Sequence, residues 1–143
     1  MKKERGKTCK ESVLISPEQA CQLMRGEYTS PISGQPPLLQ GLCADMMVNR
    51  MKPVVIVEYE RIPFVYPLGN VRVTFDTCLS SSRETALFFE RKIPRRPVLP
   101  AGMQLLEVKF DEYLPDVLYR ALQLDDLRQT AFSKYYLSRK YTI

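Results

Sequence analysis

Two apolar-rich stretches of this chain carry polar or charged residues at every second position. In VRVTFD these residues are Arg72, Thr74 and Asp76, and in LLEVKFD they include Glu107 and Lys109. Successive side chains of a β-strand point to opposite faces, so each stretch predicts a strand with one apolar face and one charged face. Arginine, lysine and carboxylate groups on one face are the groups that a site for a polyanion and its metal ion needs.

Three strands are expected to position these residues, and they span Lys52–Pro67, Gly69–Leu79 and Gly102–Asp111. The segment PLGN is typical of a turn, which predicts a hairpin between Tyr59–Tyr66 and Val71–Thr77. This hairpin could bring Arg61 to the face that carries Arg72, although the sequence alone does not set the register. From their shared parity we expect four side chains on one concave face, namely Arg61, Arg72, Glu107 and Lys109.

Helices are expected on either side of these strands. Ser16, Pro17 and Gln19 are typical of a capped helix start, and Gly26 of its end. The remaining predicted helices span Pro37–Arg50, Leu114–Leu124 and Thr130–Lys140, the last of them capped by Thr130. Lys7–Ile15 predicts a strand without a partner before it. Leu79–Gly102 predicts an irregular connection whose SSSRE segment is a polar loop rather than a serine nucleophile site.

The fold class predicted from these elements is α+β, with an antiparallel sheet and flanking helices. One alternative is an open sheet with one face in water. The other is a curled sheet, forming all or part of a tunnel-like β-barrel whose charged face lines a cavity. The basic run from Arg91 to Arg96 has two matching interpretations: a solvated loop, or a patch that attracts polyanions to a tunnel mouth.

Composition narrows the class of protein. The 143 residues suit one domain, and no apolar run approaches the ~20 residues of a membrane span. The net charge of +5 favours anionic partners only weakly, and we expect no nucleic-acid partner. Four scattered cysteines, with no secretory signal, predict reduced thiols in the cytoplasm. The chain has no histidine, which excludes a Ser-His-Asp triad, a Cys-His pair and a His-ligated zinc site.

Three motifs in order carry a family resemblance: an arginine strand leading into GNVRVTFD, then VLPAGMQLLEVKFDEYLP, then AFSKYYLSR. Over roughly Lys52–Arg139 the chain resembles the VTC domain of polyphosphate polymerases, its bacterial members most, within the triphosphate tunnel metalloenzyme (CYTH-like) superfamily. The resemblance implies a tunnel of antiparallel strands lined by basic residues. It also implies binding of a nucleoside triphosphate such as ATP and of polyphosphate, a divalent metal (Mn²⁺ or Mg²⁺), and transfer of the terminal phosphoryl group.

Residue roles follow from the same resemblance. Arg61 and Arg72 resemble the phosphate-binding arginines, and Lys134 in FSKY resembles a late lysine that contacts phosphate. Glu107 resembles the metal-binding carboxylate. Three further residues are weaker matches: Lys109, which shares the parity of Glu107; Lys10, which resembles a tunnel lysine; and Asp76, which has the parity of an inward-facing residue. Without the resemblance, a pair such as Arg72 and Glu107 fits a salt bridge in a barrel wall equally well.

The family's tunnel has an N-terminal half that this sequence does not match. We therefore expect residues 1–143 to form the C-terminal portion of a VTC-type domain, inactive as a polymerase by itself. The alternatives are a non-catalytic module that binds polyphosphate or other polyanions, and a structural fragment. In the last case the open sheet edges would allow a homodimer.

Overall fold

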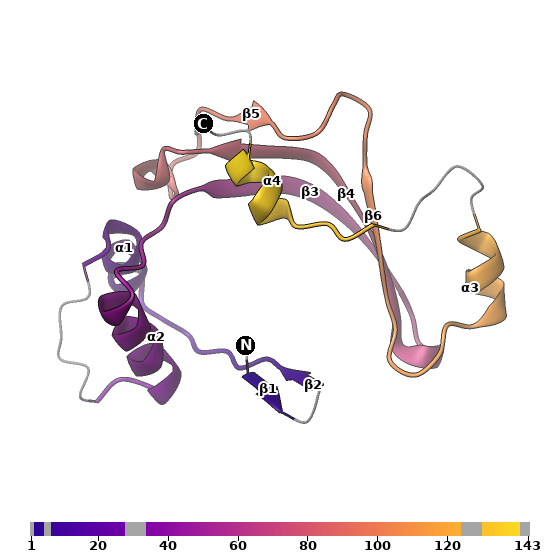
Figure 1. Cartoon of the computed structure of the whole chain (residues 1–143), viewed down its shortest axis with the longest axis horizontal. Helices are drawn as coiled ribbons and strands as arrows, with labels where there is room; N and C mark the ends of the chain where they lie inside the picture. Colours follow the sequence, from indigo (N-terminus) through magenta and orange to yellow (C-terminus); the bar gives the residue numbers. More distant parts are fainter. Residues whose placement is uncertain (1, 5–6, 28–33, 124–129, 141–143) are drawn as a thin grey trace. The chain divides into compact units, whose positions relative to one another are not determined.

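The structure, a computed structural model, describes residues 2–4, 7–27, 34–123 and 130–140. It divides into two compact units, which are described separately. Unit 1 comprises Met1–Val54 and Thr85–Arg91, and unit 2 comprises Val55–Glu84 and Lys92–Ile143. Figure 1 labels their helices and strands along the chain. In the described part of the chain, no helix has both the length and the apolar character needed to cross a membrane.

Unit 1 begins with a short hairpin. Strand β1 (Lys2–Glu4) pairs antiparallel with β2 (Lys7–Cys9), with Glu4 opposite Lys7. Two predictions are therefore wrong: the strand expected over Lys7–Ile15 ends at Cys9, and it does have a partner before it. Only two residues separate Glu4 from Lys7, which is a common length for a hairpin loop. The partner strand has three residues, too few to show a strand pattern in the sequence.

Helix α1 (Pro17–Arg25) begins and ends where its sequence predicts. The Ser16 hydroxyl accepts a hydrogen bond from the Gln19 amide at 3.2 Å, and the Ser16 amide donates to the Gln19 side chain at 2.8 Å. This is the predicted capping box, and it satisfies two amides that have no partner within the helix. Gly26 ends the helix with φ of 73°. The short helix η2 (Thr85–Leu87) lies against α1.

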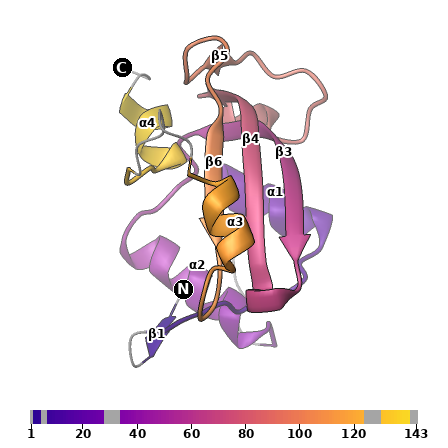
Figure 2. The same ribbon diagram turned by 90° about the vertical axis from the view of Figure 1, so that its right-hand side faces the viewer.

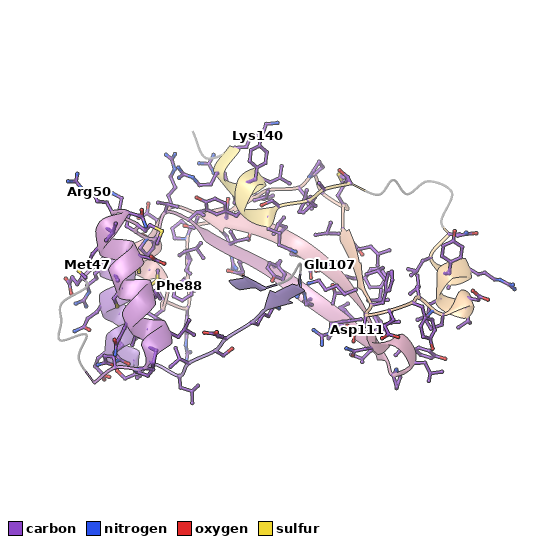
Figure 3. The ribbon with its side chains drawn as sticks, turned by 60° about the horizontal axis from the view of Figure 1, so that its bottom comes forward. Met47, Arg50, Phe88, Glu107, Asp111 and Lys140 are labelled. Atoms are coloured by element: carbon purple, nitrogen blue, oxygen red, sulfur yellow. The ribbon has the colours of Figure 1, made fainter. Side chains whose placement is uncertain are left out.

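Helix α2 (Pro37–Val48) confirms the predicted second helix. Leu39 and Met46, seven residues apart on one side, are buried. The next residue, Met47, is 45% exposed, and so is Phe88 near η2, at 47%; Figure 3 labels both. The apolar side chains of α2 are therefore only partly buried within unit 1.

Unit 2 is built on a four-stranded antiparallel sheet with a long hairpin, β3 (Ile56–Tyr66) and β4 (Val71–Ser82). The other edge of β4 pairs with β6 (Leu105–Lys109) near the turn and with β5 (Arg96–Pro97) at its far end (Figure 2). The predicted α+β class, antiparallel sheet and hairpin are confirmed. The sheet is not closed into a barrel, because within the described residues β3 pairs with β4 alone and the sheet is three strands wide.

A β-bulge interrupts the hairpin near its far end. Glu60 pairs with Thr77 but Glu58 pairs with Ser80, so Tyr59 lies opposite both Cys78 and Leu79. Cys78 has φ of 53°, the left-handed conformation that such bulges use. One extra residue reverses the alternation of faces along β4. The SSSRE segment begins as strand rather than polar loop, since Ser80, Ser81 and Ser82 are buried and paired with β3.

Two short helices follow the sheet. Helix α3 (Asp116–Ala121) is shorter than its predicted range, of which Leu124 lies outside the described residues. Helix α4 (Lys134–Lys140) begins four residues after the expected cap at Thr130. The Ser133 hydroxyl accepts a hydrogen bond from the Tyr136 amide at 3.2 Å and is the N-cap instead. Both hydroxyl residues suit a cap, so the sequence alone did not distinguish them.

The turn of the hairpin contains η1 (Leu68–Asn70) and is held by the segment after β6. The Asp111 amide donates to the Gly69 carbonyl at 3.2 Å, and the Asn70 side-chain amide donates to the Asp111 carboxylate at 2.9 Å. Gly69 has φ of 76°, and a Cβ there would lie 2.6 Å from the backbone oxygen of Tyr113. Only glycine therefore fits both the backbone conformation and the close approach.

We predict that Gly69→Ala destabilises the chain more than Gly102→Ala. Both glycines have positive φ, but a Cβ at Gly102 would meet nothing within 4 Å. Gly102→Ala should cost only the left-handed strain of a non-glycine residue, roughly 1–2 kcal/mol. Gly69→Ala must in addition displace the backbone at Tyr113. Urea unfolding of both variants measures the difference, and equal losses of stability would contradict this account of the turn.

Candidate functional site

The register of the sheet places the predicted site residues of the strands on one face. Arg61 of β3 lies opposite Asp76 of β4, and Thr74 of β4 lies opposite Glu107 of β6. Arg72 lies opposite Lys109. Residues directly opposite each other in an antiparallel pair share a face. The predicted shared face of the two arginines, the glutamate and the lysine is therefore confirmed, and we call it the charged face. Their roles in binding stay predictions.

Asp76 lies at the centre of the charged face and is 1% exposed. The Arg61 guanidinium holds its carboxylate with two hydrogen bonds, Nε to Oδ1 at 2.6 Å and Nη2 to Oδ2 at 2.8 Å. Lys134, the first residue of α4, places its ammonium 2.8 Å from the same Oδ2. From its sequence, Asp76 was only a weak candidate for this site. Its parity among the cations of neighbouring strands was the signal that could have raised it.

The Tyr59 ring contacts the same two cations. The Arg61 guanidinium carbon lies 5.1 Å from the ring centroid, and the Lys134 ammonium lies 5.0 Å from it. Both distances are within the range of cation–π attraction. Tyr59 lies opposite the β-bulge, and bulges commonly redirect side chains next to functional sites. No sequence pattern singled out Tyr59, because a bulge position cannot be read from alternation.

Glu107, on β6 and labelled in Figure 3, joins the remaining charges to this centre. Its carboxylate lies 2.9 Å from the Lys109 ammonium and 3.7 Å from Arg61 Nη2. Three cations and two carboxylates are thus connected by ion pairs, and we call these residues the charged cluster: Arg61, Asp76, Glu107, Lys109 and Lys134. They come from three strands and one helix of unit 2.

The protonation states follow from these contacts. The hydrogen bonds from Arg61, with a smaller contribution from Lys134, lower the pKa of Asp76 from 3.8 to about 2, against the opposing effect of burial. The carboxylate of Asp76 in turn raises the pKa of Arg61. Lys109 lowers the pKa of Glu107. Both carboxylates are therefore ionised near neutral pH, and the charged cluster keeps one net positive charge.

Two predicted residues lie outside the charged cluster. Arg72 is exposed on the charged face and forms no ion pair with any residue that the structure describes. The pair considered between Arg72 and Glu107 is not formed, since Glu107 pairs with Lys109 and Arg61 instead. Lys10 is exposed and belongs to unit 1, and its contact with the ligand stays a prediction.

A metal ion on the charged face would need oxygen ligands from the side chains there. Among the described residues, no group of three His, Cys, Asp or Glu side chains is placed to hold a metal. Asp76 is already bound by three N–H donors, whereas the Glu107 side chain is 34% exposed. Opposite Glu107, the buried Thr74 hydroxyl has no hydrogen-bond partner in the described part. Glu107 fits a hard cation that takes one carboxylate from the protein and its other ligands from phosphate and water.

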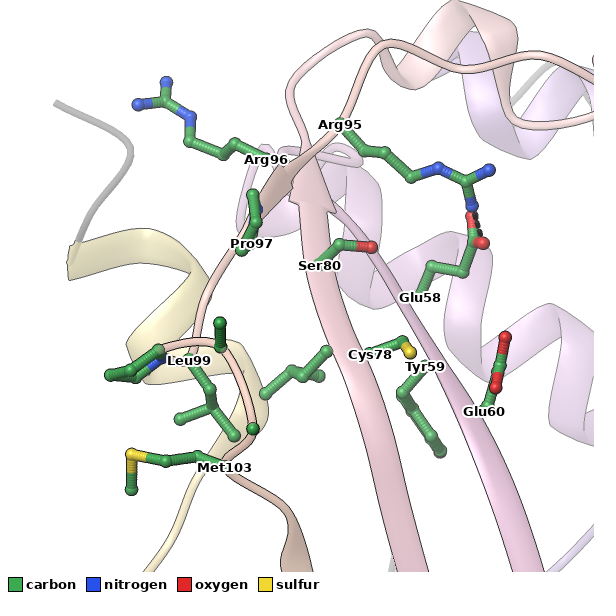
Figure 4. Close-up of a pocket in the computed structure, with 14 residues that line it drawn as sticks. Glu58, Tyr59, Glu60, Cys78, Ser80, Arg95, Arg96, Pro97, Leu99 and Met103 are labelled. Carbon is green, nitrogen blue, oxygen red and sulfur yellow. Dashed lines mark ion pairs between the residues drawn. The ribbon is translucent and has the colours of Figure 1, made fainter.

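A pocket of about 550 Å³ lies at the bulge and contains none of the charged cluster. Glu58 and Glu60, on the alternate parity of β3, line it together with Arg95, which pairs with Glu58 (Figure 4). Leu99 and Met103 form part of its apolar side. The lining carries two carboxylates, Glu58 and Glu60, and two arginines, Arg95 and Arg96, so it offers a polyanion less net positive charge than the charged face does.

We predict that Asp76 makes stability depend on pH in the acid range. Its pKa is lower in the folded protein than the ordinary 3.8, so its contribution is complete above about pH 4 and is lost as pH falls towards 2. Melting temperatures of the parent chain and Asp76→Asn, measured from pH 7 to pH 2, should differ most near neutrality and converge as pH approaches 2. A constant difference over this range would show that ionisation of Asp76 does not stabilise the fold.

The whole sequence was compared with protein families, curated proteins and solved structures. One family model, described as the VTC domain, matches residues 1–143. No curated protein and no solved structure matches the chain.

Proposed function

The chain belongs to the VTC domain family, and on this premise we propose that its charged face binds nucleoside triphosphate and polyphosphate. We further propose that a divalent metal, Mn²⁺ or Mg²⁺, assists transfer of the terminal phosphoryl group. The observation that carries the proposal is the charged cluster together with Arg72. Four cations from neighbouring elements lie on one face, and two of them are held in place by a carboxylate that is 1% exposed.

The cations differ in what they can offer to phosphate. Arg61 presents a planar guanidinium whose orientation is set by Asp76, and a planar fork suits two phosphate oxygens. Arg72 is exposed and forms no ion pair with a described residue, whereas the exposed Lys109 is paired with Glu107. The charged face therefore combines cations held by carboxylates with an unpaired one, which suits a ligand of repeating phosphate units.

Phosphoryl transfer needs charge neutralisation and in-line placement more than it needs a covalent nucleophile. The bond from the terminal phosphorus of the triphosphate to its bridging oxygen would break, and an end oxygen of polyphosphate would form the new bond. The nucleoside diphosphate leaves. Arg61 and Lys134 would hold the reacting phosphate groups, and Glu107 would hold the metal, which would supply Lewis-acid stabilisation of the developing charge.

The tunnel of the wider metalloenzyme superfamily is part of the same proposal. The sheet of unit 2 would form one wall of that tunnel, with the charged face inward. Within the described residues the outer edge of β3 is unpaired, and an unpaired edge readily accepts a further strand, from this chain or from a second copy. Closing the wall would exclude water and strengthen every phosphate contact.

A second candidate function is polyanion binding without catalysis. It is favoured by the ion pairs that already engage three of the cations and by the open sheet of the described residues. Incubation with ATP and Mn²⁺, followed by gel staining for polyphosphate, tests phosphoryl transfer by residues 1–143. Polyphosphate product would exclude a function limited to binding. Tight binding of tripolyphosphate without product is the outcome expected both of a binding module and of an incomplete tunnel domain.

We predict that the chain binds tripolyphosphate at low ionic strength and that added salt weakens the binding, because exposed charges are screened. Arg61→Ala should weaken binding about tenfold, the value of a lost charge-assisted hydrogen bond. Arg72→Ala should weaken it less, because Arg72 is exposed. Isothermal titration calorimetry measures these affinities. The matched control is Arg120→Ala, at an exposed arginine in the last turn of α3. An equal effect of all three variants would remove the charged face from the proposal.

We predict that Mn²⁺ binds in the presence of tripolyphosphate and needs Glu107. A single carboxylate holds such an ion firmly only when phosphate oxygens complete its ligands. The electron paramagnetic resonance signal of free Mn²⁺ should fall when protein and tripolyphosphate are both present, beyond the fall with tripolyphosphate alone. Glu107→Gln should abolish this extra fall, while Glu112→Gln, at an exposed carboxylate, should keep it. Retention of the extra fall by the Glu107 variant would exclude Glu107 as a ligand.

A further inference from the structure

We infer that Asp76 is a positioning residue, which orients Arg61 and Lys134 so that their remaining N–H groups meet phosphate oxygens. The inference rests on the proposed function and assigns to a carboxylate an indirect part in binding an anion. Asp76 itself would not touch the ligand, because its side chain is 1% exposed and its two oxygens accept hydrogen bonds from the two cations.

The contacts of Asp76 leave donors unused on both cations. Arg61 has five N–H groups and uses Nε and one N–H of Nη2 on Asp76, so both N–H groups of Nη1 remain. Its side chain is 37% exposed, which leaves them accessible. Lys134 uses one of three N–H groups on Asp76 and is 21% exposed. Each cation is therefore fixed on one side and open on the other.

Asp76 is suited to orient the Arg61 and Lys134 side chains as well as to balance their charge. It lies within β4, between β3 and β6, on a short side chain with little rotational freedom. The Tyr59 ring, about 5 Å from both cations, limits their movement on another side. A cation oriented before the ligand arrives loses less conformational entropy on binding, which increases affinity.

The inference and its alternative predict opposite changes in polyanion affinity for the substitution Asp76→Asn. If Asp76 were only a counter-charge, Asp76→Asn would remove a negative charge from the charged face and strengthen the binding of a polyanion. If Asp76 positions the cations, the same change weakens binding even though the face becomes more positive. Asparagine has nearly the size of aspartate but keeps only one oxygen acceptor, so it cannot receive both the Arg61 fork and Lys134.

The test is calorimetric titration of the full chain with tripolyphosphate at low ionic strength. We expect Asp76→Asn to weaken binding about tenfold or more, the loss for charge-assisted hydrogen bonds that are no longer preorganised. Glu112→Gln is the control, since it removes the same charge from an exposed position and should bind equally or slightly more tightly. Affinity of Asp76→Asn that is equal to or above that of the parent chain overturns the inference.

A second variant covers the case in which Asp76→Asn does not fold, as judged by circular dichroism. Arg61→Lys keeps the charge but cannot reproduce the bidentate contact with Asp76. We expect it too to weaken binding about tenfold. Where both variants fold, the double variant should lose little more than either single one, because the substitutions disrupt one unit. Parent-like binding by Arg61→Lys, or additive losses in the double variant, overturns the inference.

The outcomes separate this inference from the proposed function. If the parent chain does not bind tripolyphosphate, both the proposed function and the positioning role of Asp76 are excluded. A parent chain that binds, with Asp76→Asn as tight or tighter, removes the positioning role and leaves the binding function. Weakening by Asp76→Asn and Arg61→Lys, with Glu112→Gln unchanged, supports both.

Discussion

A single carboxylate that is almost fully withdrawn from water constrains the arrangement of unit 2. Asp76 could not remain ionised at 1% exposure without partners, since an unpaired buried charge is strongly destabilising. Arg61 supplies two hydrogen bonds from β3, and Lys134 supplies an ion pair from the start of α4. The edge strand and the last described helix are thus held to the central strand by one side chain.

Alternation along the strands predicted the charged face because the strand pairing is uninterrupted in the segment that carries these residues. Arg72, Thr74 and Asp76 lie between the hairpin turn and the bulge, a segment in which the face reverses at every residue. The turn itself could be predicted from Pro67 and Gly69, whose backbone preferences suit it. Local rules also gave α1, because its capping box and terminal glycine act within one turn of helix.

The missed features depend on contacts between distant residues. The pairing of Arg61 with Asp76 required the register, and the approach of Lys134 required the docking of α4, neither of which is encoded in spacing. The buried strand at Ser80–Ser82 was hidden by its composition, because serine is usual in loops. The amphipathic strands left both an open sheet and a curled, barrel-like sheet as alternatives. The sheet of the described residues is not closed, and closure depends on strand number and stagger, which the pattern of a few strands does not contain.

The bulge at Cys78 divides β4 into two segments that alternate between the faces of the sheet in opposite phase. On the side of the turn, the polarity of each position is tied to the charged face; beyond the bulge, the alternation starts anew in the opposite phase. Loss of the extra residue would exchange the faces of Ser80 and Ser81, while Asp76 stays anchored by the turn and by β6. The bulge therefore separates the alternation of the buried serines from the alternation that builds the charged face.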